Sequence, residues 1–184
     1  TLTGHNPLMF LRKMREPMLV AFSTSSSGAT LPVTLRTVEH RIGVNNDVAA
    51  FAVPLGATIN MDGTAIMQGV ATVFIAQFFG YQLGVDAYLM VILTATLASI
   101  GTAAVPGVGL ITLTLVLDQV GLPVEGIGLI IGVDRLLDML RTVVNVTGDG
   151  TVATIVAKSE GQLNVEILQD PAAGAVIEDQ SASV

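Results

Sequence analysis

The sequence contains no cysteine and no tryptophan, and few of its side chains carry a charge. Without cysteine the chain has neither disulfides nor thiolate metal sites, and His5 and His40 lie too far apart in the sequence to indicate a zinc site. The net charge of −7 excludes a basic surface for DNA or RNA. Charged residues make up 12% of the 184 residues and hydrophobic residues 51%, with a mean hydropathy of +0.70. This composition predicts a chain that is embedded in a lipid bilayer.

The two ends of the sequence differ from its apolar middle. The chain begins at Thr1 without a charged-then-apolar leader, so we expect it to be part of a longer protein. After Glu160 the sequence becomes polar, acidic and rich in alanine and serine. We therefore expect residues 161–184 to be a disordered cytoplasmic tail and residues 1–160 to form the folded core.

Few segments of the core offer the roughly 20 apolar residues that a membrane-spanning helix needs. Two segments instead have the pattern of helical hairpins with small, polar tips, at about 7–41 and about 85–120. Between them, about 47–79 predicts a helix that is interrupted at residues 60–64, and about 124–158 predicts a long last helix that carries charges. The predicted order is hairpin, helix, hairpin, helix.

The charges that flank the two hairpins predict their orientation. Lysine and arginine lie at both bases of the first hairpin, whereas only acidic residues flank the second. Because cytoplasmic segments carry the positive excess, the two hairpins should enter the membrane from opposite sides, as inverted repeats. Broken helices at this depth are typical of secondary transporters. The predicted fold is thus an all-α membrane protein with two re-entrant hairpins and two transmembrane helices, one of them unwound in the middle.

Polar residues follow one face of the last predicted helix. Their spacings of three and four residues place most of them together: Asp134, Asp138, Arg141, Thr142, Asn145 and Asp149. Each ionised group costs about 2.5–3.5 kcal/mol at the bilayer centre, so this face is expected to be functional. A guanidinium binds a carboxylate in a bidentate manner and a carboxylate can hold an ammonium, so Arg141 and Asp138 suit an acidic amino acid. The alternative is an internal ion-pair network of Asp138 with Arg141 or Arg135.

The hairpin tips and the helix break offer a second set of polar groups. Helix N-termini at residues 25–28 and at residues 107–109 direct free N–H groups toward the middle of the membrane, which suits a substrate carboxylate. Freed carbonyl groups, together with the carboxylates of Asp62 and Asp149, offer the oxygen ligands that sodium prefers. The alternative is that these glycines and serines serve only helix packing or kinks.

Four motifs carry a resemblance to a known family: TSSSG at 24–28, NMDGT at 60–64, ASIGT at 98–102, and the segment from Asp138 through Arg141 to NVTGD at 145–149. The sequence resembles the dicarboxylate/amino acid:cation symporter family, which includes the excitatory amino acid transporters and archaeal homologues that are known examples of inverted repeats. The match runs from about residue 7 to residue 161. The resemblance implies the C-terminal transport core of a glutamate-transporter-like fold. The first six helices, which supply the trimer contacts in the family, are missing from this chain.

The resemblance implies a sodium-coupled symporter of aspartate or glutamate that works by alternating access, with the second hairpin as outer lid. It implies no enzymatic activity and no cofactor other than sodium as coupling ion. Arg141 would bind the side-chain carboxylate of the substrate, Asp138 its amino group, and Thr142 and Asn145 its backbone groups. The other residues implied at the substrate site are Ser26, Ser27, Met61, Thr64, Val105, Pro106, Gly107, Gly109 and Asp134. Met61 would lie between substrate and ions and link their binding.

The resemblance also implies sodium sites. The first would take oxygens of Gly56, Asn60, Asn145 and Asp149. The second would take the carbonyl groups of Thr58, Ser99, Ile100 and Thr102. A third would combine Asn60 and Asp62 with a helix that this chain does not contain.

Three positions depart from the family pattern. Ser25 stands where archaeal members have an arginine, and Met139 stands where animal members have one. Arg135, one turn earlier, is our hypothesis for the missing cation. Gln68 stands where animal members have a proton-carrying glutamate, so proton coupling is not expected. The expected location is a cell membrane, taken to be that of a prokaryote, and the expected assembly is a homotrimer through the missing helices.

Other functions remain open at this point. Within the family, the substrate could be a dicarboxylate without an amine or a neutral amino acid, although Asp138 argues against the first and Arg141 against the second. An intramembrane aspartyl protease could use Asp149 as one acid, but such a dyad needs adjacent carboxylates without an arginine. An anion channel would need no substrate specificity.

Overall fold

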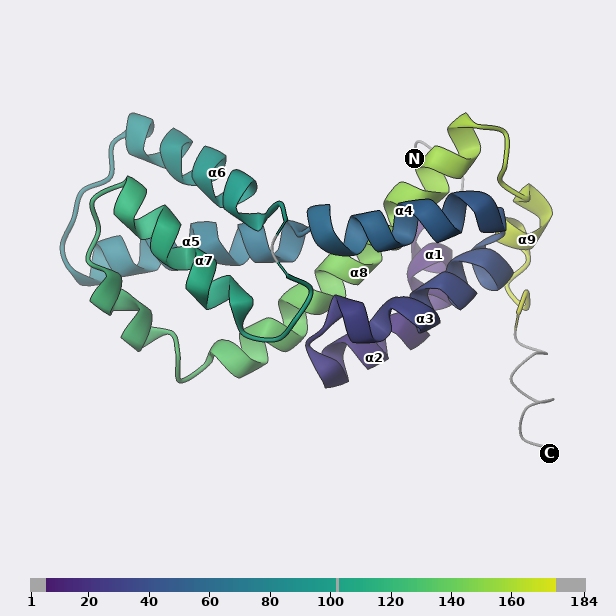
Figure 1. Cartoon of the computed structure of the whole chain (residues 1–184), viewed down its shortest axis with the longest axis horizontal. Coiled ribbons are helices and arrows are strands. Elements are labelled where there is room, and N and C mark those ends of the chain that lie inside the picture. Colours follow the sequence, from purple (N-terminus) through teal and green to yellow (C-terminus); the bar gives the residue numbers. More distant parts are fainter. Residues whose placement is uncertain (1–5, 102, 175–184) are drawn as a thin grey trace.

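The computed structural model describes residues 6–101 and 103–174, and within these ranges the chain is helical apart from one isolated β-bridge between Val44 and Leu163. Figure 1 shows an elongated molecule with α1 to α4 and α9 at one end and α5 to α7 at the other. Helix α8 runs along both groups and contacts α2, α4 and α5. The predicted all-α class is confirmed for the described residues.

The first hairpin, called hairpin 1, is built from short helices that double back at a strained residue. The outgoing leg consists of α1 (Pro7–Lys13) and α2 (Arg15–Thr24), and the return leg of α3 (Ser27–Thr37) and the π-helix η1 (Val38–Ile42). At the tip, Ser25 adopts a left-handed conformation with φ of 53°, which non-glycine residues seldom do. The reversal therefore places the serine-rich tip where two adjacent legs, which run in opposite directions, meet.

The broken helix lies between the hairpins. Helix α4 (Asn46–Ile59) ends and α5 (Asp62–Phe78) begins around Asn60 and Met61, whose backbones leave the helical region. Two non-helical residues are enough to free backbone carbonyl groups at the end of α4 and N–H groups at the start of α5. The interruption thus falls within the predicted segment 60–64.

The second hairpin, called hairpin 2, consists of α6 (Val85–Ser99) and α7 (Val108–Gln119). A short 3₁₀ helix η2 (Val124–Leu129) follows, and the last helix α8 (Asp134–Ser159) begins about ten residues later than the sequence predicted. The delay has a local reason, because glycines lower helix propensity by about 1 kcal/mol each. Three glycines, at positions 126, 128 and 132, lie between the predicted and the observed start of α8.

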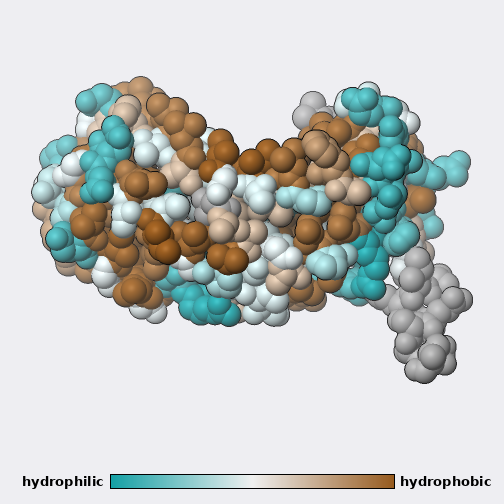
Figure 2. All heavy atoms as spheres, in the orientation of Figure 1, coloured by the Kyte–Doolittle hydropathy of each residue, from teal (hydrophilic) through white to brown (hydrophobic). Residues whose placement is uncertain are grey.

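Buried apolar side chains form two clusters, one in each half of the molecule. One cluster joins hairpin 1, α4, α9 and the end of α8, and the other joins α5, α6 and α7. Many large apolar side chains remain exposed, as Figure 2 shows across the middle of the molecule, and on α6 they include Val85, Leu89 and Ile92. Among the described helices, none is both long and apolar enough to cross a membrane. The two transmembrane helices and the inverted-repeat symmetry stay predictions.

The segment after α8 differs from the disordered tail that we expected. Residues up to Gly174 are described, and they include the short helix α9 (Val165–Gln169). The Asn164 side chain caps this helix, and Leu168 is 1% exposed within the core cluster of hairpin 1. Burial of apolar side chains offsets the polar composition on which the expectation rested. Residues 175–184 lie outside the described ranges.

Candidate functional site

The tips of the two hairpins contact each other. The Ser26 hydroxyl donates a hydrogen bond of 2.7 Å to the carbonyl oxygen of Ala104, and the N–H of Gly28 reaches the same oxygen at 3.3 Å. The Ser26 hydroxyl also accepts the N–H of Ala29, which caps α3. One serine therefore both begins the return leg of hairpin 1 and holds the tip of hairpin 2.

The polar face of α8 is buried in the middle of the molecule. All six residues of the predicted stripe are at most 7% exposed: Asp134, Asp138, Arg141, Thr142, Asn145 and Asp149. Arg135 is exposed and does not line the pocket described below. The structure thus agrees with the predicted face, but it does not support the hypothesis that Arg135 replaces the missing cation.

Arg141 is the central cation of this face. Its Nε donates to Asp138 at 2.9 Å and its Nη1 to Asp134 at 3.1 Å, while its buried Nη2 has no hydrogen-bond partner. The internal ion-pair network considered above therefore forms between Asp138 and Arg141. Its third member is Asp134, and Arg135 takes no part in it. Because a guanidinium offers five N–H donors, this network leaves donors for a further carboxylate.

The return leg of hairpin 2 lies against the same ion pair. The N–H of Gly107 donates to the second carboxylate oxygen of Asp138 at 2.7 Å. At Gly109 an added Cβ would come within 2.8 Å of the Arg141 guanidinium carbon. Gln68 of α5 holds this turn from the other side, because its amide donates to Thr112 at 2.6 Å and to the Gly109 carbonyl at 3.3 Å. The first turn of α7 is thus fixed over the guanidinium.

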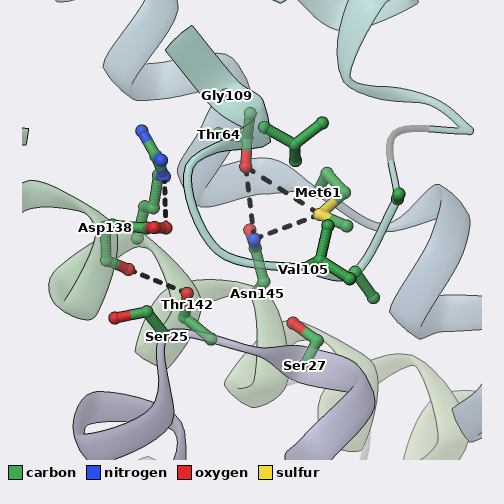
Figure 3. Close-up of a pocket in the computed structure, with 13 residues that line it drawn as sticks. Ser25, Ser27, Met61, Thr64, Val105, Gly109, Asp138, Thr142 and Asn145 are labelled. Carbon is green, nitrogen blue, oxygen red and sulfur yellow. Dashed lines mark hydrogen bonds and ion pairs between the residues drawn. The ribbon is translucent and has the colours of Figure 1, made fainter. Parts of the chain in front are cut away.

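A small pocket lies between the two tips, the helix break and α8 (Figure 3). Its cavity is about 20 Å³, which holds about one water molecule. It is lined by Ser25, Ser27, Met61, Thr64, Ala103, Ala104, Val105, Val108, Gly109, Asp138, Arg141, Thr142 and Asn145. Any ligand larger than water therefore requires the tips to part.

Most of the residues predicted for the substrate site line this pocket. Four of them do not. Ser26 bonds to Ala104 in the tip of hairpin 2, and Gly107 bonds to Asp138 of α8. Asp134 pairs with Arg141, and Pro106 is exposed. Of the other lining residues, Ser25 and Val108 lie in the tips at 25–28 and 107–109 that the sequence indicated, whereas Ala103 and Ala104 were not predicted. The buried hydroxyl of Ser25 has no hydrogen-bond partner. Its position in the run of serines at 25–27 was the sequence feature that indicated a place at the tip.

The helix break is bonded to α8 through Asn145. Its side-chain oxygen accepts the N–H of Gly63 at 2.7 Å, and its amide nitrogen donates to Thr64 at 3.3 Å and to the sulfur of Met61 at 3.2 Å (Figure 3). An added Cβ at Gly63 would lie 2.3 Å from the Arg141 carbonyl oxygen, so the two backbones are in direct contact. One amide thus connects the pocket to the break.

Asp149 is the candidate ion ligand with the clearest environment. Its side chain is 2% exposed and accepts a hydrogen bond of 3.1 Å from Asn60. An added Cβ at Gly56 would lie 2.7 Å from its oxygen Oδ1, so the carboxylate packs directly on α4. Within the described ranges no lysine or arginine forms an ion pair with it. A buried carboxylate without a cationic partner fits a bound cation.

The other predicted ion ligands are partly brought together. The N–H of Gly101 donates to the Thr58 carbonyl at 2.9 Å, which places the end of α4 beside the segment that follows α6. Ser99 is buried and Ile100 is 48% exposed, while Thr102 lies outside the described residues. Asp62 is exposed at a groove with Thr147, Gly148 and Thr151. The described residues contain no cluster of three or more His, Cys, Asp or Glu.

Comparison with known proteins finds close relatives over most of the chain. An excitatory amino acid transporter of Caenorhabditis elegans is 51% identical over 154 residues, covering 84% of this chain and 31% of the relative. Human excitatory amino acid transporter 2 is 48% identical over 161 residues, covering 86% of this chain and 28% of the relative. Mouse excitatory amino acid transporter 4 is 41% identical over 189 residues, covering 98% of this chain and 34% of the relative.

The chain therefore spans about a third of the length of these relatives. All three are animal proteins, so the comparisons do not support the expectation of a prokaryotic membrane. A sequence profile described as the sodium:dicarboxylate symporter family matches residues 1–159. The chain belongs to the sodium:dicarboxylate symporter family, a family of membrane transporters and not of enzymes.

Proposed function

We propose that this chain is the substrate- and ion-binding core of a sodium-coupled symporter of acidic amino acids. The observation that carries the proposal is the guanidinium of Arg141, which is buried under hairpin 2 and keeps one nitrogen without a partner. The relatives described above are named excitatory amino acid transporters, which supports an acidic amino acid as substrate.

In this proposal each part of the substrate meets a complementary group. The free Nη2 of Arg141 receives the side-chain carboxylate, and Asp138 receives the amino group. Thr142 and Asn145, on the same face of α8, bind the backbone groups of the substrate. The carboxylate of Asp138 already accepts the N–H of Gly107, so the amino group would share this carboxylate with hairpin 2. The substrate would thus bind a carboxylate that hairpin 2 also contacts.

The charges of the site explain why cations would accompany the substrate. The buried carboxylates of Asp134, Asp138 and Asp149 and the buried guanidinium of Arg141 together carry two net negative charges when all are ionised. An acidic amino acid adds one more. Because charge is costly to bury in a region of low dielectric, binding requires cations in the same part of the molecule.

Sodium would be held by oxygens at the helix break, as the family resemblance implies. Asp149 with Gly56, Asn60 and Asn145 supplies the first site, and the ends of α4 and α6 supply the second. The sulfur of Met61 accepts hydrogen bonds from Asn145, a residue of the first sodium site, and from Thr64, a residue of the substrate site. Occupation of the break by cations would favour closure of hairpin 2 as the outer lid, the first step of alternating access.

The experiment that tests this proposal is aspartate binding by Arg141→Cys in the presence of sodium. A site that loses the ionic partner of a buried substrate group discriminates by orders of magnitude, so binding should be abolished. Arg135→Ala is the matched control, because it removes an exposed arginine of the same helix, and it should keep wild-type affinity. Unchanged aspartate affinity in Arg141→Cys would refute the assignment.

The competing functions give other outcomes. Malate binding as tight as aspartate binding would favour a dicarboxylate carrier without use of Asp138, and serine binding would favour a neutral substrate. Ion flux without any dependence on aspartate would favour an anion channel. Membership of a transporter family excludes the aspartyl protease. We further propose that the complete protein resides in a cell membrane and forms a homotrimer through helices outside this chain.

A further inference from the structure

Lys13, at the end of α1, is a buried cation that the proposed transport function does not use. Its side chain is 2% exposed, and its ammonium donates to three backbone carbonyl oxygens: Arg41 at 2.7 Å, Ile167 at 2.5 Å and Leu168 at 2.9 Å. An ammonium has three N–H donors, so every donor is used. The acceptors come from the end of the return leg of hairpin 1 and from α9. One side chain therefore joins both legs of hairpin 1 to the end of the described chain.

Backbone contacts hold the same segment in place. The N–H of Asn164 donates to the Gly43 carbonyl at 2.8 Å, and the N–H of Asn45 donates to the Gln162 carbonyl at 3.0 Å. These bonds flank the bridge between Val44 and Leu163. Gly43 has a φ of +89°, and an added Cβ there would lie 2.6 Å from the Asn164 carbonyl oxygen. The contact is thus too close for any other residue at position 43.

Burial and charge make these contacts of Lys13 interdependent. Burial lowers the pKa of Lys13 from its ordinary value, the charge of Asp170 raises it, and the charge of Arg41 lowers it. Burial therefore opposes the ammonium form of Lys13, and the nearby carboxylate of Asp170 favours it. A shift of α9 away from hairpin 1 would break two of the three hydrogen bonds of the Lys13 ammonium, those to Ile167 and Leu168.

We propose that residues 162–170 form a clasp over the base of hairpin 1, and that Lys13 is the positioning residue that holds this clasp closed. The clasp fixes the spacing of the two legs and hence the position of the tip at Ser25 and Ser27. Within the described chain one ion pair joins the two legs, Arg36 with Glu16, and because it is largely exposed it contributes little. No ion pair of the described residues joins the legs of hairpin 2. The clasp leaves hairpin 1 as the fixed wall of the pocket.

The test is hydrogen exchange of the full-length protein in lipid nanodiscs, measured without sodium or substrate. Lys13→Met keeps the length of the side chain but removes its three donors, and we expect exchange over residues 15–45 to accelerate about tenfold or more. A stop after Gly161 removes the clasp itself and should accelerate the same residues. Arg12→Met is the matched control, since Arg12 is exposed and adjacent, and it should exchange as wild type. Residues 85–119 should be unchanged in all three.

Two results would overturn the proposal. One is wild-type exchange over residues 15–45 in the truncated protein, which also decides the matter if Lys13→Met does not fold. The other is equal acceleration in both hairpins, which would show general destabilisation and no specific clasp. Because the measurement needs neither substrate nor sodium, its failure is distinguishable from failure of the proposed transport function.

Discussion

The close approach of α5 and α8 at Gly63 makes a quantitative prediction. In Gly63→Ala the new Cβ would lie 2.3 Å from the Arg141 carbonyl oxygen, about 1 Å inside the ordinary contact distance. The start of α5 must move away, which strains the 2.7 Å hydrogen bond between the Gly63 N–H and Asn145. Overpacking costs about 1–3 kcal/mol and an unsatisfied buried N–H about 1–3 kcal/mol. We expect a loss of unfolding free energy of about 2–5 kcal/mol.

The assay is thermal unfolding of the purified protein, together with aspartate binding in saturating sodium. At about 2–4 °C per kcal/mol, the unfolding midpoint of Gly63→Ala should fall by at least about 4 °C. Affinity should fall as well, because Asn145 contacts both the break and the pocket. Gly69→Ala is the control: it lies in the same helix, nothing is within 4 Å of its added Cβ, and alanine there should be neutral or stabilising. Equal midpoints for the two variants would refute the reasoning.

Three further predictions concern the pocket and its closure. Gly109→Ala would place a Cβ 2.8 Å from the Arg141 guanidinium carbon, so aspartate should bind about tenfold or more weakly by calorimetry, and wild-type affinity would contradict this contact. Ser26→Ala removes the bond to Ala104 and the cap of α3, and it should lower unfolding free energy by about 1–2 kcal/mol in chemical denaturation. Asp149→Asn should raise the sodium concentration needed for half-maximal aspartate binding, and an unchanged sodium dependence would remove this residue from the ion site.

The polar stripe of α8 and the helix break could be predicted from the sequence because both follow from local rules. Spacings of three and four residues put Asp138, Arg141 and Asn145 on one face whatever the partner is, and the structure buries all three. Likewise, a polar segment within an apolar run indicates an interruption, and α4 ends at Ile59 just before it. Arg135 falls off the stripe by the same rule, and in the structure it is exposed and does not line the pocket.

Contacts between distant segments could not be predicted in this way. The tip of hairpin 1 is held by the carbonyl of Ala104, and a backbone acceptor leaves no trace in the sequence. Helix α9 was missed because Leu163 and Leu168 lie in a polar, acidic segment, and only the surface at Val44 shows that they can be buried. Lys13 resembled an ordinary basic flank of a hairpin, since its three acceptors are carbonyl oxygens far along the chain.

The measurement that tests the central claim most directly is a calorimetric titration of the full-length protein with aspartate, glutamate, malate and serine, each with and without sodium. The arrangement of Arg141, Asp138 and Asp149 predicts binding of aspartate or glutamate that requires sodium, with malate and serine much weaker because each lacks one of the charged groups. Aspartate binding that is equally tight without sodium, or malate and serine binding as tightly as aspartate, would contradict it.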